Sequence, residues 1–396
     1  MQVMHLQPLS LYIHFPYCLY KCQYCDFNSY AVKNDPTLYS EYVDGLIKEL
    51  SFRCSLFDQT GQFFFPKKTK LKTIFFGGGT PSLMGAAQVE RILNALSGYF
   101  EMSFQTEISL EANPKTIDKK NLNEFKMAGI NRLSLGIQSL HDKYLGAFGR
   151  IHTAEEARQA LGWAAETFSN WNADLMFGFP GQSMEEWKAD LNELLDYQSP
   201  HLSCYSFTVE EGAPYAKLVH EKKAAMPHEE DQARMFKTTQ LRILKTNLAK
   251  YEISNFAHPG FECRHNLAYW NYEPYLALGA GACGFFHQLR GANFGYRTTN
   301  FKSPQVYLKA LASGDICFDT EFISQKTAMA EFMMMALRLS NGVNAENFEK
   351  FFGKSLSEQY PQILSRLREK QWMEKDGYRL TSEGLIFSNQ AMAMFF

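Results

Sequence analysis

Short apolar runs alternate with amphipathic segments through the first 250 residues of this 396-residue chain, and this rhythm constrains the fold more than any other feature. A bounded apolar run of about four to eight residues is typical of a buried strand, and apolar residues spaced three and four apart are typical of a helix. Six strand–helix pairs follow one another: residues 11–15 with 38–52, 71–76 with 86–100, 107–110 with 118–128, 132–137 with 154–166, 173–177 with 185–195, and 202–207 with 229–248.

Strands that alternate with helices pair in parallel through right-handed crossovers. Six such units predict an α/β fold with a partial TIM-like (β/α)6 barrel, although an open doubly wound sheet has the same rhythm. In a barrel, the C-terminal ends of the strands build the active site. Polar or glycine-rich residues stand just after the predicted strands and are expected to meet at one rim: His14, residues 77–80, residues 111–114, residues 138–139, Asp174 and residues 208–210.

The rhythm breaks past residue 250, where residues 251–256 predict one more strand. Helical patterns over 326–340 and 360–370 lead into residues 372–381, in which an Asp-Gly turn predicts a hairpin. Helices followed by a hairpin resemble a winged helix, but residues 321–396 hold nine basic and nine acidic residues, whereas a DNA-reading wing is basic. We therefore expect a barrel over 1–250, a connecting region over 251–320, and a mainly helical, winged-helix-like packing or partner domain over 321–396.

The total charge and the apolar stretches indicate the surroundings of the protein. A formal charge of −2 argues against nucleic acid or an anionic membrane as a partner. The first ten residues lack the pattern of a secretion signal, and the longest weakly polar stretch, residues 275–286, is too short for a membrane helix. These features predict a cytoplasmic protein without a membrane span.

Three of the eight cysteines are crowded directly after the first predicted strand, as Cys18-Leu-Tyr-Lys-Cys22-Gln-Tyr-Cys25. Thiolates are soft ligands that suit zinc, copper(I) or iron–sulfur clusters. Structural zinc usually takes four protein ligands, which would require His14 as the fourth here. Three cysteines on a four-iron cluster would leave one iron free to bind a reacting molecule. Three unrelated cysteines remain the other alternative.

The spacing Cys-x3-Cys-x2-Cys, with Tyr24 before the last cysteine, resembles the motif of the radical S-adenosylmethionine (SAM) superfamily. That resemblance implies a [4Fe-4S] cluster on Cys18, Cys22 and Cys25, whose open iron chelates the amino and carboxylate groups of the methionine moiety. It also implies cleavage of the sulfonium C–S bond after electron transfer from the reduced cluster, and therefore an electron donor as a partner.

Residues 77–82, Gly-Gly-Gly-Thr-Pro-Ser, follow the second predicted strand. Glycines allow a close backbone approach, and Thr80 is expected to cap a helix that has Pro81 at its first position. The segment is not a P-loop, because the Gly-Lys-Ser/Thr ending is missing. It resembles the glycine-rich segment of the superfamily, which holds the methionine moiety.

Further motifs, namely Leu-Glu-Ala-Asn-Pro, Gly-Ile-Gln-Ser, Gly-Arg-Ile-His and Asp-Leu-Met-Phe-Gly-Phe-Pro, resemble one branch of that superfamily across nearly the whole chain. The branch holds the oxygen-independent coproporphyrinogen III oxidases of porphyrin biosynthesis and the heme chaperones related to them. The resemblance implies that SAM is bound by Tyr12, Tyr24, Gly78, Gly79, Thr80, Glu111, Gln138, Arg150, Asp174 and Thr208.

Three features favour the chaperones over the oxidases. The oxidases add a fourth cysteine two residues after the third, where Phe27 stands here, and they carry a longer segment before the cluster, whereas 17 residues precede Cys18 in this chain. In addition, His265-Asn266-Leu-Ala-Tyr269-Trp270 matches a His-Asn-x-x-Tyr-Trp motif to which heme binding is ascribed. Imidazole is a common heme ligand, and the two aromatic rings offer flat faces, although the Cys263 thiolate is a rival ligand.

We therefore expect a heme chaperone that binds heme near His265 and passes it to recipient hemoproteins, with the cluster and SAM supporting the transfer and without coproporphyrinogen oxidase activity. The alternative within the branch is an enzyme that oxidatively decarboxylates two porphyrinogen propionates. A zinc-stabilised regulator that acts through the winged-helix-like end is the alternative outside it.

Overall fold

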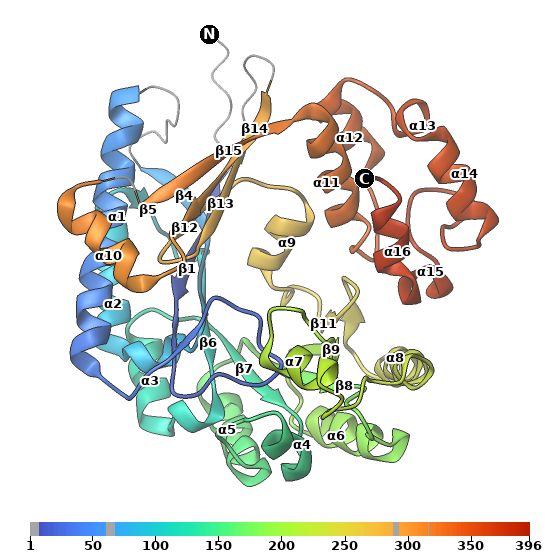
Figure 1. Ribbon diagram of the computed structural model, residues 1–396, viewed down its shortest axis with the longest axis horizontal. Coiled ribbons are helices and arrows are strands. Elements are labelled where there is room, and N and C mark those ends of the chain that lie inside the picture. The colour runs from blue at the N-terminus through green and yellow to red at the C-terminus, as the bar shows by residue number, and fades with distance from the viewer. Residues whose placement is uncertain (1–7, 61–67, 288–292, 316) are drawn as a thin grey trace.

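A twisted, mainly parallel sheet with helices along its outer face forms the body of the protein in the computed structural model, which describes residues 8–60, 68–287, 293–315 and 317–396 (Figure 1). Six strands form its parallel centre: β1 (Leu9–Phe15), β4 (Thr69–Gly78), β6 (Glu107–Ala112), β7 (Arg132–Gln138), β8 (Trp171–Phe177) and β9 (His201–Ser206). They lie in the order in which they occur along the chain, and each pairs in parallel with the next.

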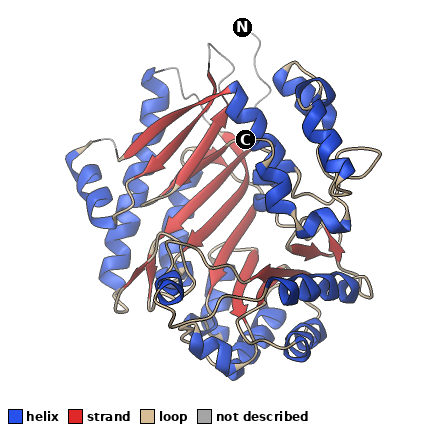
Figure 2. Cartoon of the chain, turned by 45° about the vertical axis from the view of Figure 1, so that its right-hand side comes forward, coloured by secondary structure: helices blue, strands red, loops and turns tan. Residues whose placement is uncertain are grey.

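This order confirms the predicted (β/α)6 partial barrel. A doubly wound sheet reverses its strand order at a switch point, and these six strands show no reversal. The helices of the six units are α1 (Pro36–Thr60), α2 (Ala86–Ser97), α3 (Lys119–Met127), α5 (Ala154–Thr167), α6 (Met184–Asp196) and α8 (Glu229–Ile243). They surround the strands on the outside, and the main hydrophobic core fills the space between the two layers (Figure 2).

Residues from the expected connecting region extend the sheet at both edges. Beside β1 lies β12 (Tyr275–Leu278), which is followed by the antiparallel strands β13 (Cys283–His287), β14 (Asn293–Asn300) and β15 (Phe318–Ser324). At the other edge, β11 (Asn255–Ala257) runs antiparallel to β9 and to β10 (Ala249–Lys250). The predicted strand over 251–256 is wrong in its bounds, because Glu252 instead pairs with Leu339 and its carboxylate accepts the Ser254 N–H at 2.8 Å.

The C-terminal residues form a mainly helical unit with its own hydrophobic cluster. Its helices are α11 (Gln325–Ala336), α12 (Ala345–Phe352), α13 (Leu356–Gln359), α14 (Pro361–Glu369), α15 (Ser382–Ile386) and α16 (Ser388–Ala393). The expected hairpin is reduced to one antiparallel bridge between Met373 and Leu380. The proposed domain boundaries at 250 and 320 stay a prediction. Within the described ranges, no helix combines the length and the apolar character that a membrane span requires.

Polar side chains line the inner face of the parallel strands, and this feature positions the site. On β7, Arg132, Ser134, Gly136 and Gln138 share one face because successive side chains of a strand alternate. The inner residues of the neighbouring strands are also largely polar: Glu107 and Glu111 on β6, Asn172 and Asp174 on β8, and His201 and Ser203 on β9. TIM barrels usually fill this space with branched apolar residues, so the interior here is built to receive a ligand.

Candidate functional site

The cysteine loop is held in place from both of its ends. β2 (Tyr17–Cys18) pairs with β3 (Tyr30–Ala31), and the loop between them carries Cys22 and Cys25. The Cys25 N–H donates to the Cys22 carbonyl at 3.1 Å, and the Gln23 N–H donates to the Phe148 carbonyl at 3.0 Å. These bonds fix a short stretch of backbone that would otherwise be free to move.

All three thiols line one cavity, and each sulfur has a polar neighbour. Thr80 Oγ1 lies 3.4 Å from Cys18 Sγ, Arg150 Nη1 lies 3.5 Å from Cys22 Sγ, and Ser29 Oγ lies 3.8 Å from Cys25 Sγ. Burial raises the pKa of the Cys18 thiol to about 11, against the lowering effect of the Thr80 hydrogen bond. A metal centre that binds there would displace this proton, since the thiolate is the ligand.

The geometry fits a cluster better than zinc with His14. Both ring nitrogens of His14 are occupied, Nδ1 by the Tyr12 hydroxyl at 3.0 Å and Nε2 by the Asn28 carbonyl at 2.8 Å. Among the described residues, no three His, Cys, Asp or Glu side chains converge on a point that could hold one metal ion. A single ion needs such convergence, whereas a four-iron cluster is held at its separate corners.

The glycine-rich segment lies against the cysteine loop at a distance that only glycine allows. The Gly79 N–H donates to the Phe15 carbonyl at 2.7 Å, and a Cβ on Gly79 would lie 2.6 Å from the Tyr17 carbonyl oxygen and 3.0 Å from Cys18 Sγ. Gly78 has a φ of 114°, which a side chain rarely adopts. Thr80 stands at the N-cap position of the short helix 81–84, which begins with Pro81 as predicted, but its hydroxyl bonds Cys18 and makes no side-chain cap.

Two carboxyl groups, from β6 and β8, line the same cavity. Glu111 Oε2 accepts the Gly78 N–H at 3.2 Å, while burial and the charge of Asp174 raise the pKa of Glu111 to about 8. Asp174 accepts from the Asn172 amide at 2.8 Å and from the Ser134 hydroxyl at 3.4 Å, and burial raises its pKa as well. A protonated Glu111 beside Asp174 can donate one hydrogen bond and accept others, as recognition of ribose or an amino group requires.

Gln138 faces this cavity from the end of β7. Arg150 faces it from the segment between β7 and α5. Gln138 has a φ of 70°, and the β7–β8 register shifts between Gly136 and Gln138. Strained, bulged backbone of this kind is concentrated at binding sites. Arg150 donates to the Gly136 carbonyl at 2.5 Å, but its Nε is buried without a partner. A buried N–H donor without an acceptor is expected where a ligand supplies that acceptor.

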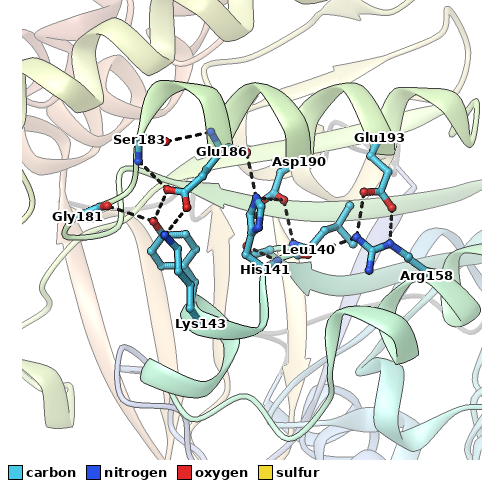
Figure 3. Close-up of polar contacts among 11 residues, drawn as sticks. Leu140, His141, Lys143, Arg158, Gly181, Ser183, Glu186, Asp190 and Glu193 are labelled. Carbon is cyan, nitrogen blue, oxygen red and sulfur yellow. Dashed lines mark hydrogen bonds and ion pairs between the residues drawn. The ribbon is translucent and has the colours of Figure 1, made fainter.

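A polar network anchors the chain directly after Gln138 (Figure 3). Asp190 of α6 is buried and accepts from the Ser139 hydroxyl at 2.8 Å and from the Leu140 N–H at 3.2 Å. The ring of His141 lies 3.3 Å from the same carboxylate, and Arg158 pairs with Glu193 one turn further along α6. The outer helix layer therefore supports the strained segment that places Gln138.

A second, larger cavity of about 600 Å³ continues from the first into the barrel. The two cavities share seven lining residues: Tyr24, Cys25, Phe27, Glu111, Ser134, Gln138 and Asp174. Tyr12 and Thr208, both predicted to bind the nucleotide, line only the second cavity. A molecule in one cavity would thus lie directly beside a molecule in the other.

The predicted heme motif forms the short helix α9 (Arg264–Trp270), which packs against the inner face of the sheet between β4 and the C-terminal helices (Figure 1). The Glu107 carboxylate accepts the N–H groups of Arg264 and His265, both at 3.2 Å. His265, Asn266 and Tyr269 line the second cavity. Trp270 lies instead under the Arg338 guanidinium, at 4.4 Å, and faces a separate hollow beside α11.

His265 is 1 % exposed, and both of its ring nitrogens have partners. Nδ1 lies 2.7 Å from the Thr73 hydroxyl, Nε2 lies 2.8 Å from the Tyr269 hydroxyl, and the ring stacks on Phe75. Burial, together with the charges of Arg132 and Lys72, lowers the pKa of His265 to about 3. The rival Cys263 is fully buried, and burial raises the pKa of its thiol to about 12.

The comparisons with known proteins agree with this architecture. Residues 12–194 match the model of the Radical SAM superfamily, and residues 323–387 match that of the HemN C-terminal domain. Coproporphyrinogen III oxidase from Escherichia coli shares the fold, with a TM-score of 0.79 over 98% of this chain and 90% of that one, at 20% identity. Fold and cysteine motif together define a radical SAM protein.

Comparison with curated relatives identifies the family within this class. The heme chaperone HemW of Haemophilus influenzae is 34% identical to this chain, and that of Bacillus subtilis is 32% identical, with 98% of each chain covered in both comparisons. The chain belongs to the HemW family.

The sequence reading missed several inner-face residues, among them Arg132, Ser134 and Asn172. The sequence pattern that marks these residues is the alternation of apolar residues with polar or small ones in Arg132-Leu-Ser134-Leu-Gly136-Ile-Gln138. The apolar residues of this pattern predict the strand. The polar half marks the wall of the cavity.

Proposed function

We propose that this protein is a heme chaperone of the cytoplasm that binds a [4Fe-4S] cluster, SAM and heme, and that passes the heme to recipient hemoproteins. The observation that carries the proposal is the adjacency of the two cavities: one is lined by all three motif cysteines, and the other by His265, Asn266 and Tyr269 of α9. The names of the full-length relatives support it. The cytoplasm keeps such cysteines reduced.

Cys18, Cys22 and Cys25 would hold the cluster. When bound, it supplies one-electron chemistry and an iron without a protein ligand. Gly78 and Gly79 line the same cavity as Cys18, and Gly79 lies directly beside the Cys18 sulfur, so their backbone would hold the methionine moiety of SAM there. Arg150, with its unpartnered Nε, would bind the carboxylate, while Glu111, Gln138 and Asp174 would hold the amino group and the ribose.

Heme would occupy the larger cavity, with Phe75 and Tyr269 as apolar and aromatic walls and His265 as the iron ligand. The low pKa keeps His265 neutral, as ligation requires. The Thr73 hydroxyl would orient the ring through Nδ1, so that Nε2 becomes the ligating atom once Tyr269 releases it.

Anaerobic analysis tests both halves of the proposal. We expect reconstituted protein to contain four irons and four sulfides per chain, to bind SAM, and to take up heme that then appears in an added apo-hemoprotein. Steady conversion of coproporphyrinogen would instead establish the oxidase activity. Zinc without iron or acid-labile sulfide would establish the zinc-stabilised alternative.

A further inference from the structure

Arg132, at the start of β7, is a buried cation without a partner. Its side chain is 2 % exposed, its Nε is buried without a hydrogen bond, and its guanidinium makes no hydrogen bond or ion pair with any residue that the structure describes. It nevertheless lines the 600 Å³ cavity. A guanidinium stays charged at every accessible pH, so burial without a partner is costly unless something else satisfies it.

The acids near Arg132 are already engaged. Glu107 accepts the backbone N–H groups at the start of α9 and forms an ion pair with Arg264 at 3.8 Å. Asp174 accepts from Asn172 and Ser134. The two carboxylates therefore act on the charge of Arg132 without a hydrogen bond to it, and its buried Nε is left without an acceptor among the described residues.

We infer that Arg132 binds a carboxylate group of the ligand that occupies the large cavity. The planar guanidinium matches a carboxylate with two parallel hydrogen bonds. This inference rests on the proposed function, under which the ligand is heme and the carboxylate is one of its two propionates. His265 and Arg132 line the same cavity, so iron ligation and propionate binding would fix the porphyrin at two points.

SAM is the other source of a carboxylate, but its carboxylate is expected at the open iron of the cluster, in the cavity that Cys18, Cys22 and Cys25 line together. Along the inner face of β7, Ser134 and Gln138 line both cavities, whereas Arg132 lines only the larger one and is absent from the cavity that all three cysteines line. Arg150 is the arginine that faces the cysteine cavity. The two arginines thus serve two different ligands.

The test measures the binding of two ligands to each of two proteins. Unaltered protein and Arg132→Gln are titrated with heme and with heme dimethyl ester, which lacks both negative charges, and SAM binding is measured by equilibrium dialysis. We expect the unaltered protein to bind heme about tenfold to a hundredfold more tightly than the ester, which is the range for a hydrogen bond to a charged group. Arg132→Gln should lose this preference while retaining its affinity for SAM.

Two further variants sharpen the result. Arg132→Lys keeps the charge without the fork and should retain part of the preference for heme. Arg264→Gln removes a half-exposed arginine next to Glu107 that does not line the cavity, and it should bind both ligands as the unaltered protein does.

Each outcome separates the two claims. If Arg132→Gln binds heme and still discriminates against the ester, or if it loses SAM instead, the role of Arg132 is refuted while the chaperone proposal stands. If the unaltered protein binds no heme, both are refuted. The comparison of heme with its ester in unaltered protein does not depend on the folding of any variant.

Discussion

The two ends of the barrel interior differ in how ready they are for a ligand. At the cysteine end, Arg150 Nε lacks a partner, Gln138 is held in a strained conformation, and glycines leave room beside Cys18. At the α9 end, both nitrogens of His265 are hydrogen-bonded. The first end is preorganised for its ligand, whereas the second must break an internal hydrogen bond before it can bind one.

The largest expected effect concerns the preorganised end. We expect Cys22→Ser to abolish cluster binding, because a four-iron cluster held by two thiolates has lost a third of its protein ligands. Iron and sulfide per chain after anaerobic reconstitution provide the measurement. Cys283→Ser, on β13 and outside the cavity, is the matched control and should keep the full cluster. Retention of four irons by Cys22→Ser would contradict the assignment of Cys22 as a ligand of the cluster.

The next effect tests whether glycine is required beside Cys18. Gly79→Ala places a Cβ 2.6 Å from a backbone oxygen, so the cysteine loop must shift. We expect about 1–3 kcal/mol of destabilisation, as for an overpacked site, together with markedly lower iron content. Gly162→Ala in α5 meets no atom within 4 Å and should be neutral or stabilising. Equal melting temperatures for the two variants would contradict the close approach.

A pH titration measures the electrostatic state of the preorganised end. The pKa of Glu111 rises to about 8 in the folded protein, so the folded state binds one proton more than the unfolded state between pH 5 and 8. The contribution of Glu111 to stability therefore falls as pH rises through this window, by about 1.4 kcal/mol per pH unit for one full proton. Five histidines act in the opposite direction near and below pH 7, because burial lowers the pKa of His14, His152, His201, His265 and His287. The contribution of Glu111 is therefore measured as the difference between the unaltered protein and Glu111→Gln.

Denaturant unfolding of the ligand-free protein at several pH values measures this slope. Glu111→Gln cannot ionise at this position, so between pH 6.5 and 8 the slope of its stability against pH should be more positive than that of the unaltered protein, by up to about 1.4 kcal/mol per pH unit. Asp174 and Arg132 act on the same carboxyl group and remain in both proteins, so they cancel in the comparison. An unchanged slope in the variant would assign the proton to another group.

The smallest effect concerns the α9 end. Tyr269→Phe removes the hydroxyl that occupies His265 Nε2, and we expect heme to bind about twofold to tenfold more tightly, as loss of one competing hydrogen bond predicts. His265→Ala should remove the spectral signature of a histidine ligand. Weaker binding by Tyr269→Phe would mean that the hydroxyl helps to bind heme, and the contrast between the two ends would then disappear.

Much of the fold was predictable, because it depends on local pattern. Each of the six parallel strands overlaps its predicted run, and α14 begins and ends within one residue of the prediction. The cysteine spacing and the strand-end motifs also brought together residues that the structure places in one cavity. Predictions failed where a side chain had a nonlocal alternative: Thr80 bonds Cys18 rather than a helix end, and Glu252 pairs with Leu339 rather than continuing a strand.

The sequence alone determined the alternation of strands and helices and the chemistry of the cysteine motif, because both depend on residues close together in the chain. Only the tertiary structure decided that α9 packs into the barrel, that His265 is hydrogen-bonded by Thr73, 192 positions away in the chain, and that Arg132 is buried without a partner. Hydrogen bonds and burial depend on which distant strands lie side by side, and local periodicity carries no information about those neighbours.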